Sequence, residues 1–295
     1  MTSTLYQQIQ NFYDASSSLW EQIWGEHMHH GYYGVAGNHR KDRRQAQVDL
    51  IEEMLAWAEV NQAEKILDVG CGIGGSSLYL ADRFNARVVG ITLSPVQASR
   101  AVERAQAMGM NGGNAVGESS AQKRPYANFQ VVDALNTPFS DNLFDFIWSM
   151  ESGEHMPDKV QFLQECYRLL KPGGAFLMAT WCHRPKHSLA GALTPDEQNH
   201  LQAIYQVYCL PYVIALPDYE AIARQIGFRQ IRVADWSMAV APFWDVVIDS
   251  ALNPSAIAGL LRSGWPAIQG ALSLGLMQRG FQRGLIRYGL LYGVK

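Results

Sequence analysis

The stretch LDVGCGIGG, from Leu67 to Gly75, constrains the fold of this 295-residue chain more than any other. A short apolar run, KILDVG, ends in a turn with glycines at 70, 72, 74 and 75, and the helical pattern GGSSLYLADRF follows. Glycine is needed where a ligand approaches the backbone at the carboxyl end of a strand, because a Cβ atom there would collide with it. The turn therefore predicts a nucleotide-like cofactor site at the first strand of a sheet.

Strand-like and helix-like runs alternate along the rest of the chain. Helical periodicity occurs over 4–24, 40–59 and 217–226, and a helical insertion at about 182–216 interrupts the alternation. A strand over 228–236 and a helical region to about 286 come later. The other strand-like runs are ARVVGITL, FQVVD, FDFIWSM, AFLMATW and RYGLLYGV. Such alternation predicts an α/β fold with a mainly parallel sheet.

Composition excludes several classes of protein. Hydrophobic residues make up 48% and charged residues 17%, as in a folded domain, and a formal net charge of −3 gives no reason to expect nucleic acid as a partner. The four cysteines have the spacing of neither a metal site nor a disulfide scaffold. No apolar run reaches the ~20 residues of a membrane-spanning helix, and the first residues show neither a signal-peptide nor a transit-peptide pattern.

Three histidines and a glutamate lie close together in GEHMHHGYYG, at residues 25–34, and GEHM recurs at 153–156. A metal site would need ligands that converge on one point. His29 and His30 are adjacent and would point apart on a regular backbone. We therefore expect no metal site in this stretch.

The glycine turn differs from the usual dinucleotide fingerprint. Asp68 lies inside the strand, two residues before the first glycine, and the spacing is D-x-G-x-G-x-G rather than GxGxxG. No GxxxxGK[ST] motif for a triphosphate is present. The turn alone leaves an NAD-dependent oxidoreductase or a non-catalytic nucleotide-binding subunit open.

Four motifs in order narrow the class. The glycine turn, Asp133 after a third strand, FDFIWS and LLKPGGAFLMATW together resemble the class I S-adenosylmethionine-dependent methyltransferases over roughly residues 60–295. That resemblance implies a Rossmann-like, seven-stranded, mostly parallel sheet. It also implies that Asp68 and the turn bind the methionine part of the cofactor, that Asp133 and Ala134 meet the adenine, and that Gln97 grips the ribose in place of the usual acidic residue. The full set of implied cofactor residues in the core is Asp68, Gly70, Cys71, Gly72, Gly74, Thr92, Leu93, Gln97, Asp133, Ala134 and Ser149.

Further stretches make the resemblance more specific. GEHMHHGYY, ITLSPVQASRA, FDFIWSMESGEHMPDK, ATWCHR and DWSMAVAPFW look like the gamma-tocopherol C-methyltransferase family. The likeness implies an N-terminal helical lid at 1–60, a methyltransferase core at 61–295 and a cap insertion at about 182–216. It also implies transfer of a methyl group to a prenylated phenol ring in vitamin E biosynthesis. Alkaloid or other amine N-methyltransferases of the same group, and methylation of a quinol precursor, are the alternatives.

Methylation of a phenol ring carbon requires a base near the hydroxyl group, because phenolate density lies on the ortho carbons. His155, Glu154 and Glu151 follow the fourth strand, at the edge where such sheets bind ligands. His183, after the fifth strand, is a further candidate for the base. The resemblance also places Tyr32 or Tyr33, in the lid, near the cofactor carboxylate or the acceptor.

The C-terminal part carries no Asp or Glu from Ser250 to Lys295. Met277, Phe281 and Leu285 are spaced along one helical face, with arginines on another, which is typical either of a helix that touches a membrane surface or of a helix packed on the domain with solvated arginines. A lipophilic phenol substrate would make such a contact useful. With no transit peptide seen, we expect a cytoplasmic or membrane-peripheral protein of a bacterium, similar to the cyanobacterial family members.

Overall fold

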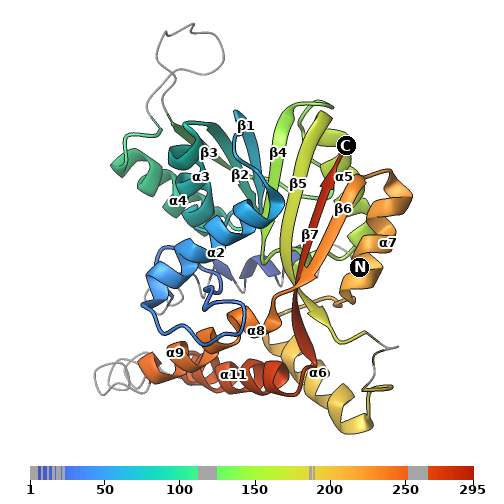
Figure 1. Cartoon of the computed structure of the whole chain (residues 1–295). Helices are drawn as coiled ribbons and strands as arrows, with labels where there is room; N and C mark the ends of the chain where they lie inside the picture. The colour runs from blue at the N-terminus through green and yellow to red at the C-terminus, as the bar shows by residue number, and fades with distance from the viewer. Residues whose placement is uncertain are drawn as a thin grey trace, which may run out of the picture.

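The computed structural model of the chain describes residues 6–7, 9–11, 13–14, 17, 21, 24–111, 125–185, 188, 190–251 and 265–295. In this part of the chain a seven-stranded sheet carries helices on both faces and a further helical layer below it (Figure 1). The strands are β1 (Lys65–Val69), β2 (Arg87–Thr92), β3 (Tyr126–Val131), β4 (Phe144–Met150), β5 (Leu170–His183), β6 (Arg229–Asp235) and β7 (Ile286–Val294).

The strand order is β3-β2-β1-β4-β5-β7-β6. The strands from β1 to β5 pair in parallel, and β7 runs antiparallel to both β5 and β6. The order reverses between β1 and β4, and such a reversal leaves a crevice for ligands at the carboxyl ends of the strands. The predicted seven-stranded, mostly parallel Rossmann-like sheet is confirmed.

Helices cover both faces of the sheet, which explains why the strands read as apolar runs. Ile66 and Phe146 belong to a buried cluster with residues of α2, α3 and α4, whereas Leu67 and Ile147 belong to a second cluster with α5 and α7. The helices are α2 (Arg43–Ala58), α3 (Gly75–Phe84), α4 (Pro95–Ala107), the 3-10 turn η1 (Gly153–His155), α5 (Lys159–Leu169), α6 (Pro195–Val207), α7 (Leu216–Ile226), α8 (Ser237–Val240), α9 (Pro242–Ala251) and α11 (Trp265–Gln282).

Several element boundaries differ from the sequence prediction. The third strand spans 126–131 rather than 129–133, and the fifth spans 170–183 rather than 175–181. The fifth strand is longer because β7 pairs with it antiparallel as far as His183, a partner that local sequence does not reveal. Within the predicted insertion only α6 is helical among the described residues. Of the predicted helix at 4–24, the described positions up to 24 are helical, and the other positions lie outside the described residues.

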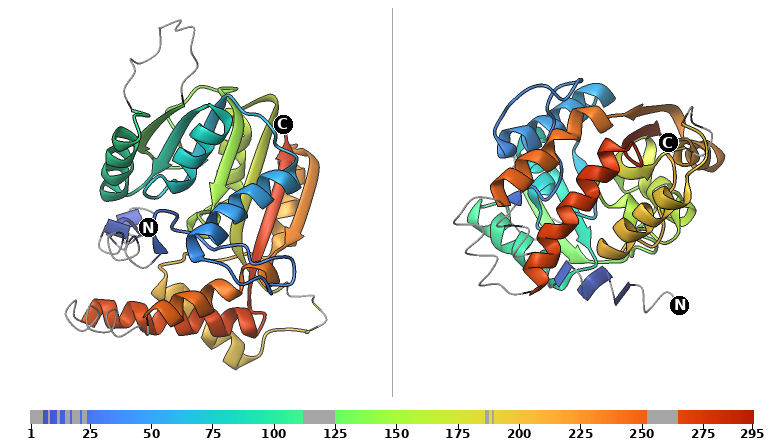
Figure 2. Two further views of the ribbon diagram at one scale, coloured as in Figure 1. Left: turned by 60° about the vertical axis from the view of Figure 1, so that its left-hand side comes forward. Right: turned by 90° about the horizontal axis from the view of Figure 1, so that it is seen from below.

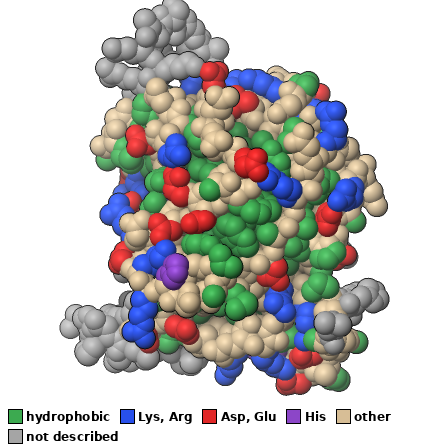
Figure 3. All heavy atoms as spheres, viewed as in Figure 1, with side chains coloured by type: hydrophobic (Ala, Val, Ile, Leu, Met, Phe, Trp, Pro, Cys, Tyr) green, Lys and Arg blue, Asp and Glu red, His purple; other side chains and the backbone are tan. Residues whose placement is uncertain are grey.

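The lower layer contains the C-terminal helix. Seen from below, α9 and α11 lie side by side under the sheet (Figure 2). Met277 and Leu285 are fully buried, so these two residues of the apolar face pack against the domain, and contact of the helix with a membrane stays a prediction. Arg283 pairs with Asp196 at 2.6 Å, and acidic side chains lie beside basic ones along the lower edge in Figure 3. No helix in the described ranges has both the length and the apolar character needed to cross a membrane.

Candidate active site

The three glycines with left-handed backbone in the turn after β1 serve different purposes. Gly70, Gly72 and Gly74 have φ angles of 82°, 53° and 83°. A Cβ atom at Gly70 would lie 2.2 Å from the Ser152 side chain, and one at Gly74 would lie 2.7 Å from the Phe129 ring. At Gly72 no atom of the described residues lies within 4 Å of that position. Gly72 thus opens onto empty space, whereas Gly70 and Gly74 permit close internal packing.

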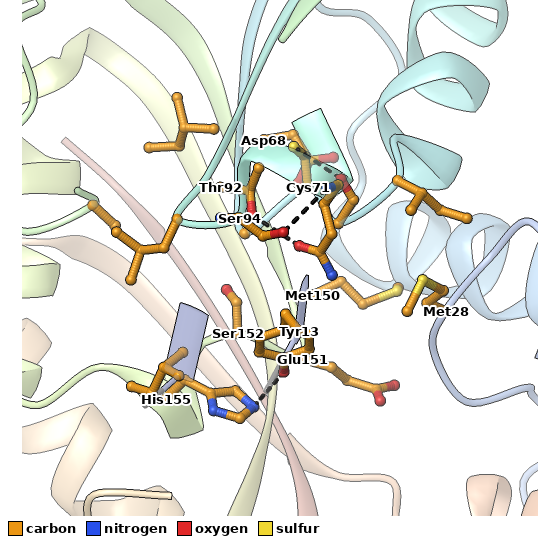
Figure 4. Close-up of a pocket in the computed structure, with 18 of the residues that line it drawn as sticks. Tyr13, Met28, Asp68, Cys71, Thr92, Ser94, Met150, Glu151, Ser152 and His155 are labelled. Carbon is orange, nitrogen blue, oxygen red and sulfur yellow. Dashed lines mark hydrogen bonds between the residues drawn. The ribbon is translucent and has the colours of Figure 1, made fainter. Parts of the chain in front are cut away.

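A cavity of about 1050 Å³, measured with its open mouth, lies in front of this turn (Figure 4). We call it the glycine-turn cavity. It lies at the carboxyl ends of β1 to β4, the edge at which such sheets bind ligands. Most of the cofactor residues predicted from sequence line it, namely Asp68, Gly70, Cys71, Gly72, Thr92, Leu93, Gln97, Asp133 and Ala134.

Four predicted cofactor residues do not line the cavity. Gly74 faces Phe129, as described above. Ser149 is buried beneath the site, where its Oγ lies 2.8 Å from Ser152 Oγ and helps to hold that lining residue in place. Tyr32 packs its ring against Trp236, and Tyr33 is buried with its backbone N–H bonded to Ala239. The prediction that either tyrosine meets the cofactor is wrong, because the chain turns both rings into the packing around α2 and α8.

The polar groups of the glycine-turn cavity are held in place by neighbouring side chains. Asp68 is buried and accepts a 2.6 Å hydrogen bond from Ser77 Oγ, and burial raises the pKa of its carboxyl group to about 7. Asp133 accepts a hydrogen bond from the backbone N–H of Leu135 at 2.9 Å. Asp68 on β1 and Asp133 after β3 therefore bring two of the carboxyl groups of this cavity, which Glu26 and Glu151 also line.

Gln97 is buried rather than solvated, although it lies in the first turn of α4. Ser94 caps this helix by accepting a hydrogen bond from the Gln97 backbone N–H at 3.0 Å. The Gln97 side-chain Oε1 accepts from Thr92 Oγ1 at 2.8 Å. Because Oε1 is occupied, the amide presents its N–H donors as the groups for a ligand.

A second, smaller cavity of about 450 Å³ adjoins the first. We call it the aromatic cavity. Its walls come from segments far apart in sequence, and they are Tyr13, Trp24, Met28, Glu151, Glu154, His155, Trp181 and Tyr208. Tyr13, Met28, Glu151 and His155 also line the glycine-turn cavity. The two cavities thus meet at these four side chains.

Tyr13 and His155 face each other at this junction (Figure 4). The Tyr13 hydroxyl lies 2.7 Å from His155 Nε2. Burial, helped by the charge of Lys159, lowers the pKa of His155 to about 3, so the imidazole is neutral. Burial also raises the pKa of Tyr13, which keeps its proton. The N-terminal tyrosine next to the histidine after β4 is therefore Tyr13, not Tyr32 or Tyr33.

Glu151 is held by three donors from distant parts of the chain. His30 donates from its backbone N–H at 2.8 Å and lies with Nδ1 2.8 Å from the other carboxylate oxygen. The Tyr288 hydroxyl donates at 2.9 Å. Although burial alone would raise the pKa of Glu151, the charge and hydrogen bonds of His30 lower it below its ordinary value. Glu151 is therefore ionised.

Glu154 has the opposite character, three residues later. Burial, reinforced by the negative charge of Glu151, raises the pKa of Glu154 to about 8. Its Oε2 accepts from Thr180 Oγ1 at 2.7 Å. The η1 turn that carries Glu154 and His155 is fixed from below by Lys159, whose Nζ donates to the carbonyls of residues 153, 154 and 156. Two carboxyl groups of unequal basicity thus line the aromatic cavity.

His183 does not belong to either cavity. Its Nδ1 lies 2.6 Å from the Arg184 carbonyl, and its backbone N–H bonds to Ile214. The prediction of a catalytic role is wrong for this residue, because β5 extends to residue 183 and carries it past the carboxyl edge of the parallel strands.

Sequence reasoning missed several lining residues. Tyr13, Met28 and His29 come from the N-terminal segment, and Ser76, Met150 and Ser152 come from the ends of α3 and β4. The last three could have been found as direct neighbours of the motifs. Tyr13 lies on the apolar side of a helical pattern, where nothing in the sequence separates a lining residue from a core residue.

Comparison with known proteins identifies the class of enzyme to which this site belongs. A sequence profile described as a methyltransferase domain matches residues 67–178. The fold, the glycine turn and this match define a class I S-adenosylmethionine-dependent methyltransferase, and S-adenosylmethionine is its methyl donor.

The chain is 48% identical to a probable chloroplastic tocopherol O-methyltransferase of Oryza sativa subsp. japonica, covering 96% of this chain and 76% of that protein. It is 45% identical to the chloroplastic tocopherol O-methyltransferase of Arabidopsis thaliana, over 98% and 82% of the two chains. The chain belongs to the tocopherol methyltransferase family.

More distant proteins share the architecture. A 2-methyl-6-phytyl-1,4-hydroquinone methyltransferase of Synechocystis is 31% identical, over 97% of this chain and 87% of that protein. A crystal structure of a putative sarcosine dimethylglycine methyltransferase from Galdieria sulphuraria superposes with a TM-score of 0.76 at 24% identity, over 96% of this chain and 98% of that chain. A Haemonchus contortus phosphoethanolamine N-methyltransferase in complex with S-adenosyl-L-methionine superposes with a TM-score of 0.75 at 19% identity, over 97% and 60%.

The expected location in a bacterial cytoplasm or at its membrane is contradicted by these relatives. The rice and Arabidopsis proteins at 48% and 45% identity are both chloroplastic. Addresses for compartments are read by receptors and leave no trace in the folded domain. The composition of the N-terminal residues was therefore the wrong basis for that expectation.

Proposed function

We propose that the protein methylates a ring carbon of gamma-tocopherol, ortho to the phenol hydroxyl, and so forms alpha-tocopherol. The observation that carries this proposal is the aromatic cavity, which adjoins the glycine-turn cavity at Tyr13, Met28, Glu151 and His155. Its Trp24, Trp181 and Tyr208 walls suit a flat, lipophilic ring. Membership of the tocopherol methyltransferase family supports the same substrate class.

The residues of the glycine-turn cavity fit the methyl donor. Gly72 leaves space for close approach, and the Asp68 and Gln97 side chains offer an acceptor and donors at its walls. We assign Asp68 and the turn to the methionine part, Gln97 to the ribose, and Asp133 with Ala134 to the adenine. When bound there, the donor supplies an electrophilic methyl group.

The N-terminal segment, residues 1–60, is proposed to act as a lid on the core at 61–295, with the insertion at about 182–216 as a cap. Tyr6, Ile9 and Tyr13 line the glycine-turn cavity although they precede the core in sequence, and Tyr208 brings the insertion to the aromatic cavity. A lid of this kind excludes water from the reacting groups.

We assign the role of base to Glu154. A group with a pKa of about 8 is partly ionised near neutral pH and is more basic than an ordinary carboxylate. His155, with its pKa lowered to about 3, is a weak base, and together with Tyr13 it is assigned to orient the ring. Glu151 is a weaker base than Glu154 because its pKa is lowered.

The position of Glu154 favours methylation at carbon over methylation at oxygen. Both the oxygen and the ortho carbon of a phenolate are nucleophilic. Glu154 lines the aromatic cavity and not the glycine-turn cavity, so a phenol oxygen bonded to it is held away from the donor. The neighbouring ring carbon then faces the methyl group, as alignment of the reacting atoms requires.

Two further acceptors are consistent with parts of the site. A hydroquinone with a prenyl tail presents the same phenol to Glu154, and the Synechocystis relative is named for such a substrate. An amine would meet the ionised Glu151 at the junction of the cavities. We rank both below gamma-tocopherol, because the relatives at 45–48% identity are named for tocopherol.

Product analysis tests this function. The protein is incubated with methyl-labelled S-adenosylmethionine and, separately, with gamma-tocopherol, 2-methyl-6-phytyl-1,4-hydroquinone and a tertiary amine. We expect label in alpha-tocopherol, with the phenol hydroxyl still free, as mass spectrometry and NMR would show. A methyl ether as the product, or faster methylation of the hydroquinone or the amine, would overturn the proposal.

A further inference from the structure

The methyl group must pass from the glycine-turn cavity to the aromatic cavity, so the sulfonium centre that carries it must lie where the two cavities meet. The four residues that line both cavities are Tyr13, Met28, Glu151 and His155. Tyr13 keeps its proton, Met28 is apolar and His155 is neutral. Glu151 is thus the one of these four that carries a charge.

The carboxylate of Glu151 cannot easily move away from this junction. It accepts hydrogen bonds from the His30 backbone, the His30 ring and the Tyr288 hydroxyl, all at 2.8–2.9 Å. These partners come from the N-terminal segment and from β7, and the rings of His30 and Tyr288 lie 5.3 Å apart between centroids. The side chain of Glu151 is only 6% exposed.

The backbone at Glu151 is also unusual. Its φ angle of 51° is left-handed, a conformation that costs a non-glycine residue of order 1 kcal/mol or more. The Glu151 N–H still bonds to Ala179 of β5 at 2.8 Å, which fixes the point where the chain leaves the sheet. Strain that is held in this way at a ligand site indicates that the position of the side chain matters.

His30 is enclosed by aromatic rings, which exclude water from it. The His30 side chain is 0% exposed. The ring centroids that lie 4.8–6.5 Å from its own belong to Trp24, Trp181, Phe243, Trp244, Phe281 and Tyr288. This enclosure keeps water from the hydrogen bond between His30 and Glu151. It also fixes the His30 imidazole ring, which orients the Glu151 carboxylate.

We propose that Glu151, positioned by His30 and Tyr288, is a fixed anion that selects the positively charged methyl donor over its uncharged thioether product. S-adenosylmethionine carries a sulfonium charge at the junction, and S-adenosylhomocysteine carries none there. A pair of opposite charges a few ångströms apart in a protein changes affinity by roughly tenfold or more. The same carboxylate gives the product no such attraction, so the product leaves without competing strongly with the donor.

This inference rests on the methyl donor and not on the identity of the acceptor. A failure of the gamma-tocopherol proposal would leave it intact, because the experiment measures binding in the absence of an acceptor. The groups that face Glu151 are His29 and His30 from the N-terminal segment, Tyr13 from the helical residues before it, Tyr288 from β7 and Glu154 from the same loop.

The test compares two ligands that differ in charge at the reacting position. Sinefungin carries an ammonium group where the donor carries its methyl sulfonium, and S-adenosylhomocysteine is neutral there. Calorimetric titration at pH 7.0 is made with the wild type and with Glu151→Gln. We expect sinefungin to bind about tenfold more weakly to the variant and S-adenosylhomocysteine to change less than about twofold. Equal losses for the two ligands, or no loss for sinefungin, would overturn the proposal.

Glu154→Gln is the matched control. Glu154 is three residues away and lines only the aromatic cavity, and at pH 7.0 its carboxyl group is mostly protonated. Its replacement by an amide removes little charge, so we expect an unchanged ratio of the two affinities. A change as large as that in Glu151→Gln would contradict a specific role for Glu151.

A pH series tests the positioning role of His30. In His30→Phe the burial of Glu151 is no longer offset by the imidazole, so the pKa of Glu151 rises. Because Asp68 titrates near pH 7 in both proteins, the readout is the ratio of variant to wild-type affinity for sinefungin, which should be several-fold lower at pH 6.5 than at pH 8.5. A ratio that does not change with pH would refute the role. Tyr288→Phe, which removes one donor and keeps the ring, should show the same trend more weakly and serves if His30→Phe fails to fold.

Discussion

The two adjoining cavities were built by the chain in different ways. The glycine-turn cavity is lined mainly by short runs at the ends of neighbouring parallel strands, and its polar groups are fixed by nearby residues, as Ser77 fixes Asp68. The aromatic cavity draws single side chains from the N-terminal segment, the loop after β4, the end of β5 and the end of α6. The glycine-turn cavity is therefore built mainly from local sequence motifs, whereas the aromatic cavity forms only when distant segments come together in the folded chain.

This difference matches the ligands that we propose for the two cavities, the methyl donor for the glycine-turn cavity and the acceptor for the aromatic cavity. The methyl donor is the same throughout the class, so a short motif at the switch point of the sheet suffices. Acceptors differ among members of the class, and variable segments placed over a constant scaffold can change them without disturbing the fold. Glu151 and His155 line both cavities, so their positions must suit the ligands of both.

Gly70→Ala should cause the largest loss, because it breaks the local motif. The added Cβ atom would lie 2.2 Å from the Ser152 side chain, and the residue would also be strained at φ 82°. We expect destabilisation by about 2–4 kcal/mol and no measurable binding of S-adenosylhomocysteine. Gly72→Ala should cost only ~1 kcal/mol of stability while still weakening binding. Thermal unfolding and calorimetry measure both, and equal losses of stability would contradict the distinction between the two glycines.

Tyr13→Phe tests the junction between the cavities. Loss of the hydroxyl leaves His155 Nε2 without its 2.7 Å partner. We expect kcat to fall by roughly 10–100-fold, with S-adenosylhomocysteine binding within about threefold of wild type. His155→Ala should act in the same direction. Tyr32→Phe is the control and should have wild-type kinetics, because Tyr32 packs on Trp236 outside both cavities. An equal effect of the two tyrosine variants would contradict this arrangement.

The pH profile tests Glu154 as the base of the aromatic cavity. The base must be ionised, and burial raises its pKa to about 8, so kcat/KM should rise with pH through about 8. Glu154→Gln should lower kcat by ~10–100-fold and abolish this rise. A rise that persists in the variant would assign it to another group.

The raised pKa of Glu154 also makes the stability of the folded protein depend on pH. A carboxyl group whose pKa is raised on folding stabilises the protein below its unfolded pKa, near 4.5, and this contribution is lost as pH rises through about 8. The melting temperature of the wild type should therefore fall more between pH 6 and 9 than that of Glu154→Gln.

Gln97→Ala should have the smallest effect and concerns the glycine-turn cavity alone. The buried amide is held by Thr92, and in our proposal it offers its N–H donors to the ribose. Loss of one or two neutral hydrogen bonds should weaken S-adenosylhomocysteine by about 5–10-fold. Methylthioadenosine, which keeps the ribose and lacks the amino acid, should weaken equally. Gln106→Ala, at an exposed position of the same helix, is the matched control and should bind both ligands normally.

The sequence by itself determined the class of fold and the donor end of the site. The glycine turn, Asp68, Asp133 and the Ser94 cap lie within continuous runs whose geometry follows from strand, turn and helix preferences. Gln97 was also predicted, although a sequence cannot show that an amide in the first turn of a helix is buried. The resemblance placed Tyr32 or Tyr33 near the cofactor carboxylate or the acceptor, whereas the N-terminal tyrosine beside His155 is Tyr13.

Tertiary structure alone decided the rest. Which tyrosine meets His155 depends on where the N-terminal segment crosses the sheet, and which glutamate is ionised depends on what is packed against each one. Glu151 and Glu154 are alike in sequence and three residues apart. His30 keeps Glu151 charged, whereas burial raises the pKa of Glu154 to about 8, so that only a minor part of it is ionised at neutral pH. The ionisation of a buried glutamate depends on the groups packed around it. Because those groups come from distant parts of the chain, the local sequence does not predict it.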